Sequence, residues 1–70
     1  MTAAKKIKVL LVQREMTLKD LANLLNISAP TLSNKMRRDN FREKDLIEIA
    51  RVLNFDYSIV FTDKETGETF

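Results

Sequence analysis

The chain of 70 residues has no cysteine and no histidine, and it contains only one glycine and one proline. Without cysteine, neither a disulfide framework nor a thiolate metal site can form. Without histidine, the commonest general base and the commonest metal ligand are missing. The acidic residues suggest no catalytic pair in a chain this short. We therefore expect a protein that is not an enzyme and that binds no metal, cofactor or small-molecule ligand.

Long hydrophobic runs are missing as well. The apolar run at residues 9–12 is too short for a signal sequence, and no small-residue cleavage site follows it. No segment approaches the ~18 apolar residues of a membrane span. We expect a cytoplasmic protein that is not associated with a membrane. Residues 1–70 suit one domain, and a domain of this size buries only about 60% of its unfolded surface, so a second copy would supplement its stability.

The net charge of +2 hides an asymmetry between the two halves of the chain. Residues 1–38 carry eight basic and two acidic side chains, which gives +6. Residues 39–70 carry four basic and eight acidic side chains, which gives −4. A basic half favours a polyanionic partner on one side of the molecule. An ordinary mixed surface is the alternative.

The most informative stretch, residues 17–36, consists of two amphipathic segments joined by a turn. The apolar residues of the first segment follow the spacing of one helical face: Leu18, Leu21, Ala22 and Leu25. Asn26, which tolerates the left-handed conformation, interrupts the pattern. A second segment begins at Ser28 and places Leu32 and Met36 four residues apart. Two helices joined by a turn of about three to four residues form a helix-turn-helix, whose second helix enters the major groove of DNA.

Helices are also expected on both sides of this motif. The predicted helical segments are about residues 3–15, 17–25, 28–38 and 43–53. The expected fold is therefore mainly α, with four to five helices over about residues 3–55.

Local signals mark where these helices begin. Thr17 is a predicted N-cap with Asp20 as its capping-box partner, and Ser28 is a second predicted N-cap. Pro30 falls in the first turn of its helix, where the missing N–H is not needed. Arg42 would be the N-cap of the last helix, a position for which arginine is a poor residue.

From Tyr57 the apolar period changes from about 3.6 to about 2, as in a half-buried strand. Asp63 opens a four-residue loop in which Gly67 can supply a positive φ. A return strand would then pair Phe61 with Phe70 and Thr62 with Thr69. We predict a C-terminal β-hairpin over about residues 57–70.

This hairpin would present one apolar face. Its members are Tyr57, Ile59, Phe61 and Phe70. An isolated two-stranded hairpin is barely stable in water, so the face must pack on the chain's own core or on a second copy. We expect the second copy, and hence a homodimer that forms through the hairpin.

The segment TLKDLANLLNISAPTLSNKM, residues 17–36, resembles the DNA-binding motif of the Cro and phage-repressor type (XRE family) transcriptional regulators. The positions that match in order and spacing are Thr17, Leu21, Ala22, Ile27, Ser28, Thr31, Leu32 and Ser33. The resemblance covers about residues 3–56. Three residues depart from the family pattern: Leu18 replaces a usual Gln, Asn26 replaces a Gly, and Pro30 occupies a position that often carries a polar base-reading side chain.

The resemblance implies a lambda-repressor-like domain of bacterial or phage type that binds double-stranded DNA sequence-specifically, as a homodimer, with residues 28–38 in the major groove. Such a protein is expected to be associated with the nucleoid through DNA. The base-reading residues it implies are Ala29, Pro30, Thr31 and Asn34. The expected phosphate contacts are Thr17, Lys19, Ser28, Ser33, Lys35, Arg38, Asn40 and Arg42. Further candidates for phosphate contact are Arg37 and the N-terminal lysines Lys5, Lys6 and Lys8.

The rival interpretation is a protein-interaction module, an antitoxin-like or adaptor helical domain without specific DNA binding. Leu18 and Pro30 favour it, because polar DNA contacts are usual at both positions in the family. The operator sequence, the choice between repression and activation, and the replicon of origin do not follow from the sequence.

Overall fold

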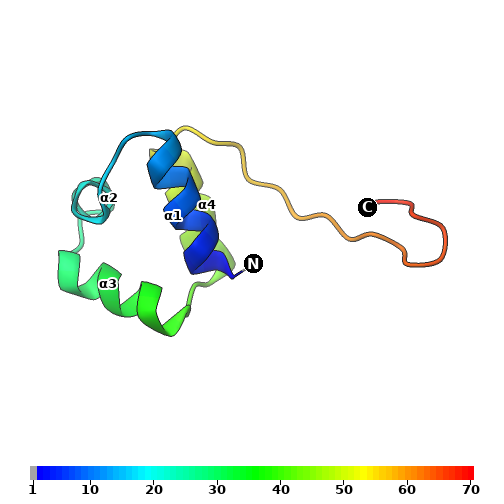
Figure 1. Cartoon of the computed structure of the whole chain (residues 1–70), viewed down its shortest axis with the longest axis horizontal. Coiled ribbons are helices and arrows are strands. Elements are labelled where there is room, and N and C mark those ends of the chain that lie inside the picture. The colour runs from blue at the N-terminus through cyan, green and yellow to red at the C-terminus, as the bar shows by residue number, and fades with distance from the viewer. Residues whose placement is uncertain (1) are drawn as a thin grey trace.

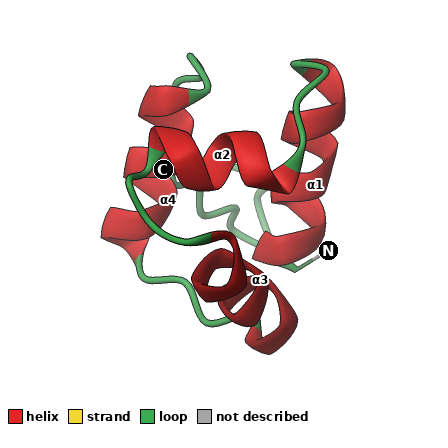
Figure 2. Cartoon of the chain, turned by 90° about the vertical axis from the view of Figure 1, so that its left-hand side faces the viewer, coloured by secondary structure: helices red, strands yellow, loops and turns green. Residues whose placement is uncertain are grey.

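The computed structural model describes residues 2–70 and contains four helices connected by short loops (Figure 1). They are α1 (Ala3–Gln13), α2 (Leu18–Leu24), α3 (Ala29–Arg38) and α4 (Glu43–Val52). Figure 2 shows α2 lying across α1 and α4, with α3 below. The mainly α, four-helix prediction is confirmed. None of the helices formed by residues 2–70 has the length and apolar character needed to cross a bilayer.

The core is made by the inward faces of all four helices. Its buried members are Ala4, Ile7, Leu11, Leu21, Ala22, Leu32, Met36, Ile49 and Leu53, the last of these just after α4. Leu21 of α2 and Leu32 of α3 are the largest side chains that are fully buried. Full burial of a leucine contributes about 1.5–3 kcal/mol, so these two residues help to hold α2 and α3 against the core.

The predicted caps of α2 and α3 form as expected. The Thr17 hydroxyl accepts from the Asp20 N–H at 3.1 Å, and the Asp20 carboxylate accepts from the Thr17 N–H at 2.8 Å, which completes a capping box. The Ser28 hydroxyl accepts from the Thr31 N–H at 3.2 Å. Pro30 lies in the first turn of α3. Each cap satisfies N–H groups that a helix start leaves without partners.

Arg42 is the N-cap of α4, and its side chain makes no capping hydrogen bond. A guanidinium has no acceptor, so it cannot serve the free N–H groups. The carboxylate of Asp45 works in the other direction and accepts from the Arg42 N–H at 2.9 Å. Half of a capping box therefore holds the start of α4 and leaves the Arg42 side chain free.

The helix ends use residues other than glycine in the left-handed conformation. These residues are Glu15 (φ 54°), Asn26 (φ 58°), Asp39 (φ 52°) and Asn54 (φ 63°). Asparagine and aspartate tolerate this conformation best after glycine, and the only glycine of the chain is Gly67. The left-handed Asn26 confirms the predicted end of α2. Glu15 lies beyond the end of α1, which stops at Gln13 rather than at the expected residue 15.

Two tertiary contacts hold the ends of α1. The carboxylate of Asp39, after α3, accepts from the Ala4 N–H at 2.8 Å. The Arg14 guanidinium donates to the carbonyls of Leu53 at 2.8 Å and Asn54 at 3.0 Å. It also lies 3.8 Å from the centre of the Phe55 ring, in cation–π geometry. Both contacts cap helix ends across more than thirty residues of chain.

Residues 56–70, which we call the C-terminal arm, leave the end of α4 and run away from the helical body (Figure 1). At the tip, Phe61 and Phe70 exchange two backbone hydrogen bonds of 3.0 and 2.9 Å, and Thr62 and Thr69 form one antiparallel bridge. The predicted register is therefore confirmed. The predicted β-hairpin over residues 57–70 is wrong, because no strand forms in residues 2–70 and residues 57–60 face no other segment of the arm.

The arm does not pack on the core of its own chain. Ile59, Phe61 and Phe70 are exposed, and only Tyr57, at the root of the arm, is half-buried. The radius of gyration is 13.7 Å, whereas a compact chain of this length would have about 11 Å. Of the two partners that the apolar face could have, its own core is excluded in this structure.

Candidate nucleic-acid interface

The candidate interface is built on the outer face of α3. Leu32 and Met36 point into the core, so the intervening polar residues are directed outwards. Of the four predicted base-reading residues, Pro30, Thr31 and Asn34 are exposed. The fourth, Ala29, is half-buried and packs against the core, so it offers less surface to a ligand than expected.

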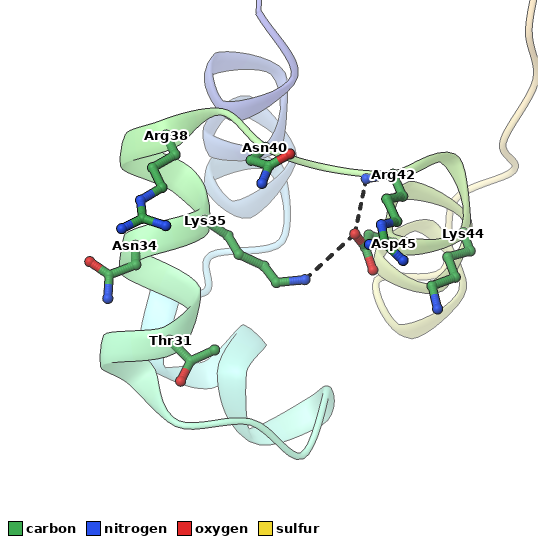
Figure 3. A pocket seen from close by; sticks show the side chains of 8 residues that line it. All are labelled: Thr31, Asn34, Lys35, Arg38, Asn40, Arg42, Lys44 and Asp45. Atoms are coloured by element: carbon green, nitrogen blue, oxygen red, sulfur yellow. Dashed lines mark hydrogen bonds and ion pairs between the residues drawn. The ribbon is translucent and has the colours of Figure 1, made fainter.

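A groove of about 530 Å³ lies between α3 and the start of α4 (Figure 3). We call it the α3–α4 groove, and its lining residues are Thr31, Asn34, Lys35, Arg38, Asn40, Arg42, Lys44 and Asp45. Six of these eight residues belong to the predicted base-reading and phosphate-contact sets. Predicted base-reading residues and predicted phosphate-contact residues thus share one surface. They do so because the loop after α3 places the N-terminus of α4 beside α3.

The α3–α4 groove is rich in positive charge. Four of its lining side chains are cationic, namely Lys35, Arg38, Arg42 and Lys44, and one, Asp45, is anionic. A cluster of cations beside an exposed polar helix face is the arrangement that binds a phosphate backbone. Figure 3 shows Asn34 and Arg38 on the α3 side and Arg42 and Lys44 on the α4 side.

Asp45 connects the two sides of the groove. Its carboxylate accepts from the Arg42 N–H and lies 3.5 Å from the Lys35 ammonium group. The backbone hydrogen bond from Arg42, assisted by the charge of Lys35, lowers the pKa of Asp45 below its usual value. Asp45 is therefore ionised at neutral pH and partly neutralises Lys35. In the sequence, the signal for this role is that Asp45 follows the N-cap residue Arg42 by three positions, the spacing of a capping box.

The amide of Asn34 already has a partner. Its carbonyl oxygen accepts from the Arg37 guanidinium at 2.8 Å. Bidentate recognition of adenine uses both the oxygen and the nitrogen of an asparagine amide. The Asn34 oxygen has two lone pairs, so it can accept from an adenine in addition to Arg37, and the amide nitrogen remains available as a donor.

Four predicted phosphate contacts lie outside the lining of the α3–α4 groove: Thr17, Lys19, Ser28 and Ser33. The hydroxyls of Thr17 and Ser28 act as helix caps, and that of Ser28 is also 2.7 Å from the Thr31 hydroxyl. Lys19 and Ser33 are exposed. The N-terminal lysines belong to α1, and none of them lines this groove either.

The chemistry available here is binding. Residues 2–70 include no group of three or more acidic side chains arranged to hold a metal ion. The α3–α4 groove offers ammonium, guanidinium, amide and hydroxyl groups, which suit anionic oxygens and the edges of bases.

A comparison with known families gives a match to a DNA-binding domain. The model of a family described as a Cro/C1-type HTH DNA-binding domain matches residues 6–58. The matched region includes the α3–α4 groove and ends near the root of the C-terminal arm. No curated protein and no solved structure gives a match.

Proposed function

Because the chain belongs to the Cro/C1-type helix-turn-helix DNA-binding family, we propose that it regulates transcription by inserting α3 into the major groove of a specific DNA site. The observation that carries the proposal is the α3–α4 groove, where four cations adjoin the exposed face of α3. An enzyme would need a different kind of site, and the family is normally not enzymatic.

In this proposal the exposed residues of α3 contact base edges. Asn34, whose oxygen also accepts from Arg37, pairs with adenine through its amide. The Thr31 methyl, and the apolar surfaces of Pro30 and Ala29, suit a thymine methyl group. The half-buried Ala29 makes the smallest contribution.

The cations of the α3–α4 groove contact phosphates. Arg38 and Arg42 have free guanidinium groups on opposite sides of the groove, and Lys35 and Lys44 add ammonium groups. Asn40 donates from the loop between the helices. The remaining proposed phosphate contacts are Thr17, Lys19 and Ser28, at the N-terminal ends of α2 and α3, and Ser33 in the second turn of α3. The backbone N–H groups at the start of α3 favour anions as well.

We propose further that residues 1–70 act as one unit that binds DNA as a homodimer. A single small module makes few contacts, and two modules on a two-fold symmetric site increase both affinity and specificity. The apolar side chains of the C-terminal arm supply a surface for association, which consists of the half-buried Tyr57 and the exposed Ile59, Phe61 and Phe70.

The test is the salt dependence of binding to a random DNA duplex, followed by fluorescence anisotropy. A groove that neutralises several phosphates gives an affinity that falls steeply with salt. Arg38→Ala should weaken binding to all sequences alike and reduce the slope by about one unit. Arg51→Ala is the matched control, because Arg51 is exposed, pairs with Glu48 and does not line the α3–α4 groove.

A protein-interaction module predicts a different result. Its binding to random DNA would be weak and nearly independent of salt, and Arg38→Ala would have no effect.

The base-reading role of Asn34 is tested on a site selected from a random library, where Asn34→Ala should cost about 1–3 kcal/mol of binding free energy and relax the preferred sequence. Equal losses on the selected and the random duplex would contradict the base-reading role of Asn34.

A further inference from the structure

We propose that the C-terminal arm of one chain lies in an apolar groove between α1 and α4 of a second copy, and that the exchange is reciprocal. This inference extends the proposed homodimer by naming the surface that receives the arm. It uses no residue of the α3–α4 groove, so the two proposals can fail separately.

The arm has apolar side chains and backbone groups without partners. Ile59 is 50% exposed, Phe61 is 72% exposed and Phe70 is 74% exposed. The backbone of residues 57–60 makes no hydrogen bond to any other described residue. An extended segment with free N–H and C=O groups is a template for pairing with another chain. Both properties indicate that the arm is complete only when another surface covers it.

A receiving surface exists on the same molecule. An open groove of about 310 Å³ is lined mainly by Ala3, Lys6, Ile7 and Leu10 of α1 and by Leu46 and Ala50 of α4. Phe55, Asp56, Tyr57 and Ser58, at the root of the chain's own arm, also line it. Beyond Ser58 the arm runs outwards, as Figure 1 shows, and residues 59–70 do not line the groove of their own chain.

The opposite net charges of the C-terminal arm and of α1 favour the arm of a second copy as the occupant of the groove. The arm carries four carboxylates and one lysine, a net charge of −3, whereas α1 carries three lysines and no acidic residue, a net charge of +3. The acidic side chains of the arm are Asp56, Asp63, Glu65 and Glu68, and the lysines of α1 are Lys5, Lys6 and Lys8. Of these three lysines, Lys6 lines the groove, together with Asp56 of the chain's own arm. The distal carboxylates of a partner's arm would meet the ammonium group of Lys6 at the groove and the two further lysines on the same helix. Lys6, which is also a candidate for phosphate contact, is assigned to this interface.

A second copy satisfies both surfaces at once. Because arm and groove belong to the same chain, a two-fold axis lets each copy give its arm and receive the other. The closed dimer leaves neither surface free, so it does not continue into a filament.

The first experiment measures association by sedimentation equilibrium without DNA. The intact protein should be a dimer at micromolar concentration. Phe61→Ser should raise the dissociation constant about tenfold or more, because it removes a large apolar side chain from the interface of both chains. Val12→Ser is the control, since Val12 of α1 is equally exposed, at 73%, and lies outside the α1–α4 groove. An intact protein that remains monomeric, or equal effects of the two substitutions, overturns the inference.

The second experiment locates the arm. The chain lacks cysteine, so single cysteines can be placed at will. Chains with Ala3→Cys are mixed with chains carrying Thr62→Cys and joined by a flexible reagent that links two thiols. A link between these different chains supports the arm in the groove, and Val12→Cys in place of Ala3→Cys should give little product. Links between two Thr62→Cys chains alone would mean that arms pair with each other, which overturns the proposed groove.

Neither experiment uses DNA. A salt-dependent DNA affinity in a monomeric protein would refute only the arm exchange. A dimer without DNA affinity would refute only the proposed function.

Discussion

At the scale of single residues, Asp45 combines three interactions in one carboxylate. It accepts a hydrogen bond from the N-cap of α4, pairs with Lys35 of α3, and adds the only negative charge to a groove lined by four cations. If the α3–α4 groove holds phosphates as proposed, this carboxylate repels the DNA backbone and competes with phosphate for Lys35. We interpret Asp45 as a residue that limits binding to any sequence while it holds the two helices together.

We predict that Asp45→Asn strengthens binding to random DNA. The asparagine oxygen can still accept from the Arg42 N–H, whereas Lys35 is released for phosphate contact. The expected gain is roughly tenfold at low salt, with a salt slope steeper by up to about one unit. Fluorescence anisotropy on a random duplex measures both values.

Glu48→Gln is the control for this experiment. It removes a carboxylate from the same helix, one that is paired with Arg51 and does not line the α3–α4 groove. If Asp45→Asn left the affinity unchanged, or lowered it in a protein of unchanged stability, Asp45 would not restrain DNA binding.

At the scale of the elements, the caps decide where the helices begin and end. α2 and α3 start at Thr17 and Ser28, whose hydroxyls serve free N–H groups. α4 starts at Arg42, which cannot do so, and it depends on Asp45 instead. This weaker cap leaves a cation at the rim of the α3–α4 groove, which suggests that DNA contact takes precedence over helix stability at this position.

We predict that Arg42→Ser stabilises the protein and weakens its DNA binding. A serine hydroxyl would accept from the Asp45 N–H and complete the capping box, for a gain of about 1 kcal/mol. A gain of that size raises the melting temperature of a domain this small by roughly 4–8 °C. Thermal unfolding followed by circular dichroism measures the first effect, and binding to a random duplex measures the second.

Arg42→Ala serves as the reference, because it removes the same charge and adds no acceptor. It should weaken DNA binding as much as Arg42→Ser and give no comparable rise in melting temperature. A more stable Arg42→Ser protein with full DNA affinity would exclude the phosphate contact.

At the scale of the whole molecule, the protein is a helical body with an arm, and its ionisable groups set how it responds to pH. Hydrogen bonds from backbone N–H groups lower the pKa of Asp20 and of Asp45, chiefly those of Thr17 and Arg42 respectively. The hydrogen bond from Arg51 lowers the pKa of Glu48. A carboxyl group with a lowered pKa in the folded state stabilises that state above its unfolded pKa and loses this effect as the pH falls.

We predict that the free energy of unfolding is nearly constant from about pH 5 to 8 and falls below about pH 4. The flat region follows from the absence of histidine, the side chain that ordinarily titrates there. Urea unfolding at a series of pH values measures the profile. Asp20→Asn should be less stable at neutral pH and should lose less stability on acidification. A transition between pH 5 and 8 would contradict the prediction.

Much of the body could be predicted from the sequence because its signals are local. Apolar spacing along residues 17–36 indicated two helices, and Thr17, Asn26 and Ser28 marked their ends. The structure confirms each of these, and the family match confirms the helix-turn-helix. The pairing of Thr62 with Thr69 at the tip of the arm could be predicted for the same reason, because the local turn that ends at Gly67 sets this register.

Other features depended on contacts between distant parts of the chain. The Arg14 contacts with Leu53 and Asn54, and the Asp39 contact with Ala4, join segments that no local pattern relates. The groove that contains both Asn34 and Lys44 exists because the loop after α3 places α4 beside α3.

The alternation of apolar residues from Tyr57 onwards predicted a strand, but a strand also needs a facing partner, and the chain supplies one only at the tip of the arm. The sequence by itself determined the helices, their caps and the family. Tertiary structure alone decided which charges share a groove and left the arm exposed, because both depend on how the helices pack in space.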